Sequence, residues 1–188
     1  NQDVRDSESL MALTLISTHT ASASATIDIT SGIDSTYDSY EFHFVNMHPA
    51  TDDVQFQFQV NAAGQSGFNE TMTTTLFRAY NREGTPDYGL GYVSSADQAQ
   101  GTAYQPLTNK GGADADQSAS GILTLYDPSS TTYVKHFTAT TQFSYEAEYS
   151  MVFYAAGYIN VTAAIDEISF KMSSGNIDAG TIKMFGVS

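Results

Sequence analysis

Glu146 and Glu148 have the residue type and the spacing of a catalytic carboxylate pair. They stand in YEAEY, and residues two apart on a strand share one face, about 7 Å from each other. A separation of that size is compatible with the two carboxylates of a glycosidase. Such carboxylates usually come from different strands, however. We therefore interpret the pair as a solvated strand end beside Tyr145 and Tyr149, and we expect the chain not to be an enzyme.

Acidic and histidine side chains are the next candidates, as metal ligands. Asp114 and Asp116 in GGADADQS resemble half of a calcium loop, but the later bidentate glutamate that completes such a loop is missing. Asp97 and Asp127 would complete a site only through the fold. The histidines are scattered without HxH or HExxH spacing: His19, His43, His48 and His136. The sequence therefore predicts no metal and no cofactor, with calcium in the acidic loop as the open alternative.

Nucleophile and phosphate motifs are missing from the sequence. There is no GxSxG elbow, and NKGG has its glycines after the lysine, which is the wrong order for a phosphate loop. Lys135 and His136 in VKHF form a local polar pair of the kind that packs within a strand more often than it catalyses.

Arginine and tyrosine side chains offer binding chemistry instead. Arg78 and Arg82 flank Tyr80 and have the chemistry to anchor a carboxylate, although an internal or intersubunit salt bridge is the simpler expectation. Three more tyrosines are candidates for glycan stacking or for subunit contacts: Tyr88, Tyr92 and Tyr104. Tyrosine is enriched at protein interfaces, so we favour the subunit contacts.

The elements that position these residues are strands. In DVQFQFQV, residues 53–60, apolar and glutamine side chains alternate, which predicts Val54, Phe56, Phe58 and Val60 in a core and the glutamines against solvent or a neighbouring subunit. Similar alternation predicts strands at 11–18, 23–29, 40–46, 120–127, 131–143, 150–161, 165–172 and 180–187. Residues 69–80 favour extended structure, with a helix over 76–80 as an alternative.

Nine or ten strands at regular spacing predict an all-β fold, an antiparallel, jelly-roll-like β-sandwich. Residues 81–118 carry many Gly, Asp, Asn and Gln and little periodicity, so they read as a long irregular excursion of the functional or interface-forming kind. We expect a single domain over residues 11–188, preceded by a polar arm at residues 1–10.

Composition excludes several classes of partner. The 188 residues include 21 acids and only 7 lysines and arginines, a net charge of −14, so we expect no nucleic acid and no anionic membrane as partner. There is no cysteine, which rules out disulfides and thiolate metal sites. The opening NQDVRDSESL lacks the features of a signal peptide, so we expect assembly in a cytoplasm.

Three stretches carry a family resemblance: residues 11–57, residues 120–137 with the hydroxyl-rich SSTTYVKHF, and residues 155–187 with SGNIDAGTIKMFG. Together they resemble a family of small structural proteins of tailed bacteriophages, frequent in marine phages. The resemblance covers nearly all of residues 11–188, whereas residues 1–10 depart from the usual start at the MAL position. It implies a virion protein, a capsid-decorating or tail-associated β-module, and it brings no catalytic residues.

We therefore expect a capsid decoration or cement protein on the outer surface of the virion, assembled in the host cytoplasm. Its partners would be copies of itself, as a homotrimer, and the major capsid protein or another virion protein. The arm at residues 1–10 and the excursion at residues 81–118 are the elements expected to assemble it. The alternative is a tail-associated receptor-binding module that recognises host polysaccharide through loop tyrosines.

Overall fold

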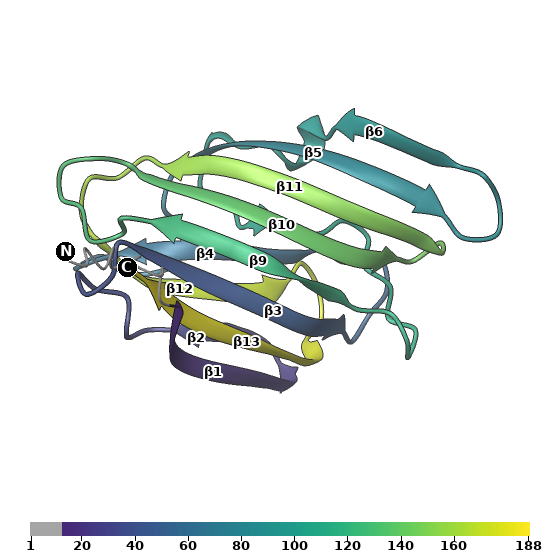
Figure 1. The fold of residues 1–188 in the computed structure, drawn as a ribbon, viewed down its shortest axis with the longest axis horizontal. Helices are drawn as coiled ribbons and strands as arrows, with labels where there is room; N and C mark the ends of the chain where they lie inside the picture. The colour runs from purple at the N-terminus through teal and green to yellow at the C-terminus, as the bar shows by residue number, and fades with distance from the viewer. Residues whose placement is uncertain (1–12) are drawn as a thin grey trace, which may run out of the picture.

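Two antiparallel sheets stack face to face in the computed structural model, which describes residues 13–188 (Figure 1). The larger has nine strands in the order β1-β13-β3-β9-β10-β11-β5-β6, with β7 also paired to β5, and the smaller has the order β2-β12-β4-β8. The strands are β1 Leu13–Ser24, β2 Ile27–Ile29, β3 Ser39–Pro49, β4 Phe56–Ala62, β5 Met72–Arg82, β6 Tyr88–Tyr92, β7 Ala99–Gly101, β8 Gln105–Pro106, β9 Ala119–Tyr126, β10 Lys135–Tyr145, β11 Tyr149–Ile159, β12 Ile165–Met172 and β13 Ile177–Val187.

Eight of these strands have the winding of a jelly roll. Counted along the chain, β1, β2, β3, β4, β8, β9, β12 and β13 are strands one to eight, and they lie in the orders 1-8-3-6 and 2-7-4-5. The predicted antiparallel, jelly-roll-like sandwich is therefore confirmed. The other strands are insertions: β10, β11, β5 and β6 extend the larger sheet beyond β9, as Figure 1 shows from its middle to its top.

The core lies between the sheets and is built on phenylalanines. Phe44, Phe56 and Phe170 pack with ring centroids 5.2 to 5.9 Å apart. Burying each ring contributes on the order of 2 kcal/mol. The predicted inward face of residues 54–60 is confirmed, since all four of its apolar residues are buried.

The glutamine face of the same stretch was predicted to meet solvent or a neighbouring subunit, and for Gln59 this is wrong. Gln59 is fully buried, and its Nε2 donates to the carbonyl oxygens of Glu70, Thr102 and Ala103 at 3.0 to 3.2 Å. The segment just before β8 therefore covers the outer face of the smaller sheet. Alternation identified the two faces but not the chain that covers one of them.

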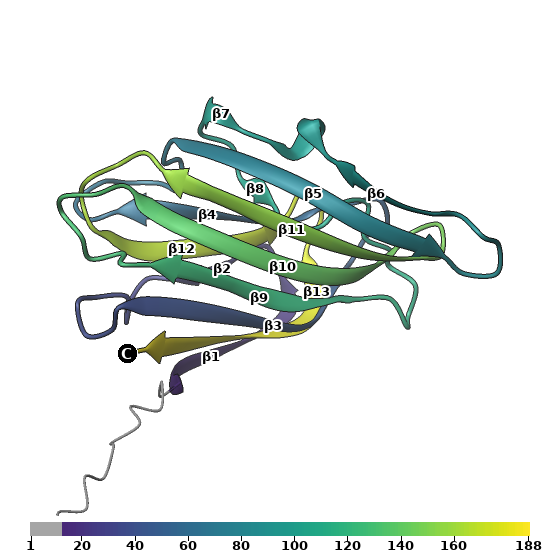
Figure 2. The same cartoon turned by 45° about the horizontal axis from the view of Figure 1, so that its top comes forward.

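The excursion at residues 81–118 is more ordered than its composition suggested. It contains β6, β7, β8 and a 3-10 turn, Ser94–Ala96. Its middle part joins the two sheets through backbone hydrogen bonds. The Leu107 amide donates to the carbonyl oxygen of Phe56 in β4, and the Gln98 carbonyl oxygen accepts from the amide of Thr74 in β5. Gln105 is fully buried there, and its Oε1 accepts from Thr74 Oγ1 at 2.8 Å. The stretch around Gln98, Gln105 and Leu107 is internal packing, whereas β6 and the loop before it project outward (Figure 2).

Three other sequence expectations differ from the structure. The strand predicted at 23–29 is broken, because β1 ends in the larger sheet and β2 begins in the smaller one, so the chain changes sheet between them. Residues 76–80 belong to β5 and not to a helix. Short strands such as β7 and β8 were missed, since two or three residues carry no periodicity. The predicted arm at residues 1–10 and Met11 lie outside the described residues.

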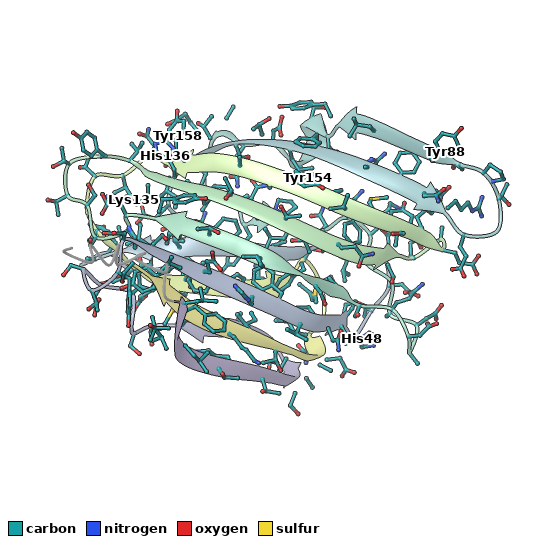
Figure 3. The ribbon with its side chains drawn as sticks, viewed as in Figure 1. His48, Tyr88, Lys135, His136, Tyr154 and Tyr158 are labelled. Carbon is teal, nitrogen blue, oxygen red and sulfur yellow. The ribbon has the colours of Figure 1, made fainter. Side chains whose placement is uncertain are left out.

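Lys135 closes one end of the sandwich (Figure 3). The residue is fully buried, and its Nζ donates to the carbonyl oxygens of Tyr133, Val161 and Thr162 at 3.0, 3.2 and 2.9 Å. These three carbonyls belong to the β9–β10 and β11–β12 loops, so one ammonium group holds two crossing segments together. Burial lowers the pKa of Lys135 below its usual value. The expectation that the Lys135–His136 pair packs within a strand holds for the lysine.

Candidate binding site

At one end of the molecule the added strands extend beyond the part of the fold that covers them. Along β5 the inward positions Met72, Thr74 and Leu76 are buried, whereas the next inward position, Arg78, is only partly buried and Arg82 is exposed. The inner face of the sheet therefore becomes accessible at this end. Side chains that continue the inward pattern of β5, β10 and β11 line a pocket there.

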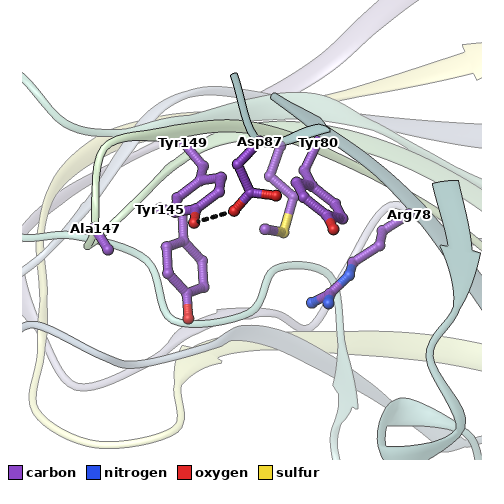
Figure 4. A pocket seen from close by; sticks show the side chains of 7 residues that line it. Arg78, Tyr80, Asp87, Tyr145, Ala147 and Tyr149 are labelled. Atoms are coloured by element: carbon purple, nitrogen blue, oxygen red, sulfur yellow. Dashed lines mark hydrogen bonds between the residues drawn. The ribbon is translucent and has the colours of Figure 1, made fainter. Parts of the chain in front are cut away.

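The pocket has a volume of about 260 Å³ and opens between the β10–β11 and β5–β6 hairpins (Figure 4). Its lining consists of Arg78, Tyr80, Asp87, Tyr145, Ala147, Tyr149 and Met151. Most of these residues combine an apolar body with a polar tip. The sequence pattern that signalled the site was the Arg-x-Tyr-x-Arg alternation at 78–82, but Asp87, Tyr145 and Tyr149 were not predicted to join it.

The aromatic rings of the pocket are arranged edge to face. The Tyr80 and Tyr149 centroids lie 5.9 Å apart at an interplanar angle of 66°, and those of Tyr145 and Tyr149 lie 5.5 Å apart at 81°. The guanidinium carbons of Arg78 and Arg82 lie 5.3 and 5.4 Å from the ring centroids of Tyr80 and Tyr149. These cation–π contacts orient both arginines without using all of their donors.

Asp87 reaches the pocket from the β5–β6 loop. Its Oδ2 accepts a hydrogen bond from Tyr149 Oη at 2.7 Å, the dashed line in Figure 4. That hydrogen bond to a carboxylate raises the pKa of Tyr149, so the phenol stays protonated and continues to donate. The pocket thus presents the carboxylate of Asp87 and the guanidinium group of Arg78, while the Arg82 guanidinium lies over the Tyr149 ring.

An internal salt bridge was the simpler expectation for Arg78 and Arg82, and it does not form within residues 13–188. In that part of the chain Lys110 pairs with Asp53 at 3.1 Å and with Glu146 at 3.6 Å, whereas neither arginine has a carboxylate oxygen within 4.0 Å. An intersubunit pair stays a prediction. In a chain with three acids for every base, two arginines that find no such partner among residues 13–188 are unexpected.

The three candidate tyrosines do not come together. Tyr88 and Tyr92 are 75% and 63% exposed on the outward face of β6, where Leu90 lies between them at 74%. Tyr104 instead lies on the smaller sheet: its Oη donates to Ser169 Oγ at 3.1 Å, and Lys171 Nζ lies 4.2 Å from its ring centroid. Desolvation raises the pKa of Tyr104. A role in subunit contacts or glycan stacking stays a prediction for all three.

The fold brings the other chemical candidates together only in part. Glu146 and Glu148 were expected on one face of a strand, but they lie in the turn between β10 and β11, where Glu148 has φ 64° and Glu146 pairs with Lys110. Within residues 13–188 no three His, Asp or Glu side chains lie close enough to hold a metal ion. Asp114 and Asp116 do line one open cavity, together with Glu83 and Glu148, but Asp97 and Asp127 do not join them there. His48 and His136 lie at opposite ends of the sandwich (Figure 3).

A second candidate surface is the outer face of the nine-stranded sheet, which sequence reasoning did not single out. Among residues 13–188, every exposed large apolar residue except Tyr133 belongs to a strand of this sheet. One row in register across it consists of Tyr92, Phe77, Tyr154, Thr140, Ile122 and His43. The Phe77 and Tyr154 rings stack with centroids 4.8 Å apart. The strands of the sheet contain two carboxylates, Glu41 and Asp178.

Comparison with known proteins found no match among protein-family models, curated protein sequences or solved structures. Within residues 13–188, no helix has the length and apolar character needed to cross a bilayer.

Proposed function

We propose that the chain is a structural protein of a tailed-bacteriophage virion, a decoration or cement protein that works on the outer head surface as a homo-oligomer. The observation that carries this proposal is the outer face of the nine-stranded sheet, which is broad, nearly free of carboxylates and lined with exposed aromatic and aliphatic side chains. Large exposed apolar faces of this kind mark interaction surfaces.

Charge favours a second copy of the chain as the partner on this face. Two molecules that each carry −14 repel one another wherever their acidic loops meet. The outer face of the nine-stranded sheet lets them approach with few carboxylates between them. An ordinary interface of about 1,600 Å² would then cover its apolar side chains. We propose a cyclic trimer, in which one part of this face on each chain contacts a different part of the same face on the next chain.

The placement on a virion draws support from three features outside this face. The sequence resembles structural proteins of tailed phages over nearly all of residues 11–188. The chain contains no cysteine, which suits assembly in a reducing cytoplasm. The jelly roll is a winding that viral capsid domains use repeatedly, although it also occurs in lectins and enzymes, so the fold alone does not choose the function.

Oligomeric state and copy number test the proposal. Sedimentation of the purified chain should give a species of about three times 20.3 kDa. Ile122→Glu places a carboxylate near the centre of the face and should dissociate the trimer into single chains. Tyr133→Glu adds the same charge at an exposed loop position and should leave the trimer intact. Quantitative mass spectrometry of virions should give hundreds of copies. A monomeric wild-type chain, or virions without the chain, would overturn the proposal.

The second candidate is a tail-associated receptor-binding module, which the arginine–tyrosine pocket favours. The copy number separates the two candidates, since a tail module would be present as only a few oligomers per virion.

A further inference from the structure

We propose that the pocket formed by Arg78, Tyr80, Asp87, Tyr145 and Tyr149 binds a carboxylated sugar, a hexuronic acid unit of a polysaccharide. The pocket is open at the surface and its lining combines aromatic rings, guanidinium donors and one carboxylate. The inference does not depend on whether the chain sits on a head, on a tail or elsewhere.

The arginines select a ligand with an anionic group. Arg78 lines the pocket, and no carboxylate of residues 13–188 lies within 4.0 Å of its guanidinium nitrogens or of those of Arg82. The planar guanidinium group matches a carboxylate in a two-bond arrangement. Because Arg78 is held over the Tyr80 ring, its orientation is set before the ligand arrives, which lowers the entropy cost of binding.

The tyrosines select a ligand with a flat apolar side. The C–H bonds on one face of a pyranose ring carry partial positive charge and pack against the negative face of an aromatic ring. Tyr80, Tyr145 and Tyr149 stand at large angles to one another, at 66° and 81°, so the rings meet a ligand from more than one direction. A simple carboxylate such as acetate would leave most of this aromatic surface uncovered.

Asp87 selects hydroxyl groups. One of its oxygens accepts from Tyr149 Oη, and the carboxylate can accept further hydrogen bonds from sugar hydroxyls. Gly89 leaves room for the Tyr80 side chain in its present position, because a Cβ at residue 89 would lie 2.9 Å from Tyr80 Oη. A ligand that satisfies the arginine, the rings and Asp87 together carries a carboxylate, an apolar face and hydroxyls, as a hexuronic acid does.

The overall negative charge does not exclude an acidic ligand. At physiological salt the Debye length is about 8 Å, so acidic loops farther away are largely screened. Nearer carboxylates stand at the edge of the pocket, since Glu146 and Glu148 flank the lining residue Ala147, and Glu83 and Glu148 line an adjoining cavity together with Tyr149. The charged groups that line the pocket itself are the guanidinium of Arg78 and the carboxylate of Asp87, and the Arg82 guanidinium lies over the Tyr149 ring. We expect binding at 0.15 M salt and weaker binding at low salt, where the remote acids act over a longer range.

Calorimetric titration of the full chain with tri-galacturonate at 0.15 M salt tests the inference, with maltotriose and acetate as matched ligands. Tri-galacturonate should bind, and the two matched ligands should bind at least about tenfold more weakly. Arg78→Gln should weaken tri-galacturonate binding roughly tenfold or more, and Tyr149→Phe, which removes the hydrogen bond to Asp87, should weaken it less. Lys183→Gln removes the same charge from an exposed position on β13 and should leave the affinity unchanged.

Several results would overturn the inference: no heat with tri-galacturonate, equal affinity for maltotriose, equal affinity for acetate, or unchanged binding in a folded Arg78→Gln variant. Thermal melts establish that each variant is folded, and because Arg78 is only partly buried we expect the substitution to be tolerated. Failure of this test would leave the oligomer proposal intact, since the pocket and the outer face of the nine-stranded sheet lie on opposite faces of β5.

Discussion

Replacing Lys135 by methionine should destabilise the fold, although methionine keeps most of the apolar stem. The substitution removes three hydrogen bonds from the ammonium group to backbone carbonyls, at 2.9 to 3.2 Å. Hydrogen bonds to a charged group contribute about 1.5–3 kcal/mol each. The cost of burying the ammonium offsets much of that sum, by several kcal/mol. We expect a net loss of about 2–4 kcal/mol at pH 7, because three buried carbonyls also lose their donor.

Urea unfolding followed by circular dichroism measures this loss directly. In a chain of this size each kcal/mol corresponds to about 2–4 °C in the melting temperature, so Lys135→Met should melt roughly 5 to 15 °C below the wild type. Lys183→Met is the matched control, since Lys183 is exposed on the outer face and its loss should change stability by less than about 0.5 kcal/mol. A Lys135→Met variant as stable as the wild type would show that desolvation outweighs the hydrogen bonds.

The same substitution has a signature in pH. Burial lowers the pKa of Lys135 in the folded state, whereas in the unfolded chain it is near 10.5. Between these two pKa values the unfolded state binds more protons, so the stability of the wild type rises with pH through that window. The difference in unfolding free energy between wild type and Lys135→Met should therefore widen as the pH is raised toward 10.5. A constant difference would contradict the assigned burial of the charge.

Three further predictions address other parts of the fold. Gln59→Leu should lower the free energy of unfolding by about 2 kcal/mol, because three carbonyl oxygens lose the amide donor that they share. Amide hydrogen exchange should become faster at residues 102–103, which cover Gln59, and unchanged exchange there would show that Gln59 does not hold this segment in place. Gly121→Ala should cost at least about 2 kcal/mol in thermal melts, since its Cβ would lie 2.2 Å from a carbonyl oxygen of β10, whereas Gly91→Ala, with no neighbour within 4 Å, should not. Tyr40→Phe should cost about 1–2 kcal/mol at pH 7 by losing the hydrogen bonds to Asp34. Burial raises the pKa of Tyr40 in the folded state, so the stabilising effect of its hydroxyl group is present below pH 10 and should fade above pH 10. Urea unfolding from pH 7 to 11 tests this, and a constant difference in unfolding free energy between wild type and Tyr40→Phe would contradict it.

Much of the fold was readable from local pattern. The alternation at residues 54–60 and 40–44 assigned the inward aromatic residues correctly, because side-chain direction in a strand has a period of two wherever the strand lies. The spacing of such stretches indicated an antiparallel sandwich with jelly-roll winding. The break in the predicted strand at 23–29 was not readable, since nothing in seven residues says that the chain will leave one sheet for the other.

The candidate sites were readable only in part. Arg78, Tyr80 and Arg82 stood out by residue type and spacing, yet their pocket depends on two distant tyrosines. Tyr149 reaches it because β11 pairs with β5, and Tyr145 reaches it because the end of β10 pairs with Tyr149. Tyr88, Tyr92 and Tyr104 were grouped because they are close in sequence, and the structure separates them, since Tyr104 follows the chain onto the smaller sheet.

By itself the sequence determined which side chains each strand turns inward, the lack of thiol chemistry and the strongly acidic surface. The tertiary structure decided which strands are neighbours and which glutamines are buried. It also decided that four added strands extend one sheet, whose outer face is left uncovered and whose inner face opens into a pocket at one end. The physical reason is the distance along the chain over which each property is determined. Side-chain direction is fixed by the local backbone, whereas exposure depends on what other segments pack on top, and that depends on the whole chain.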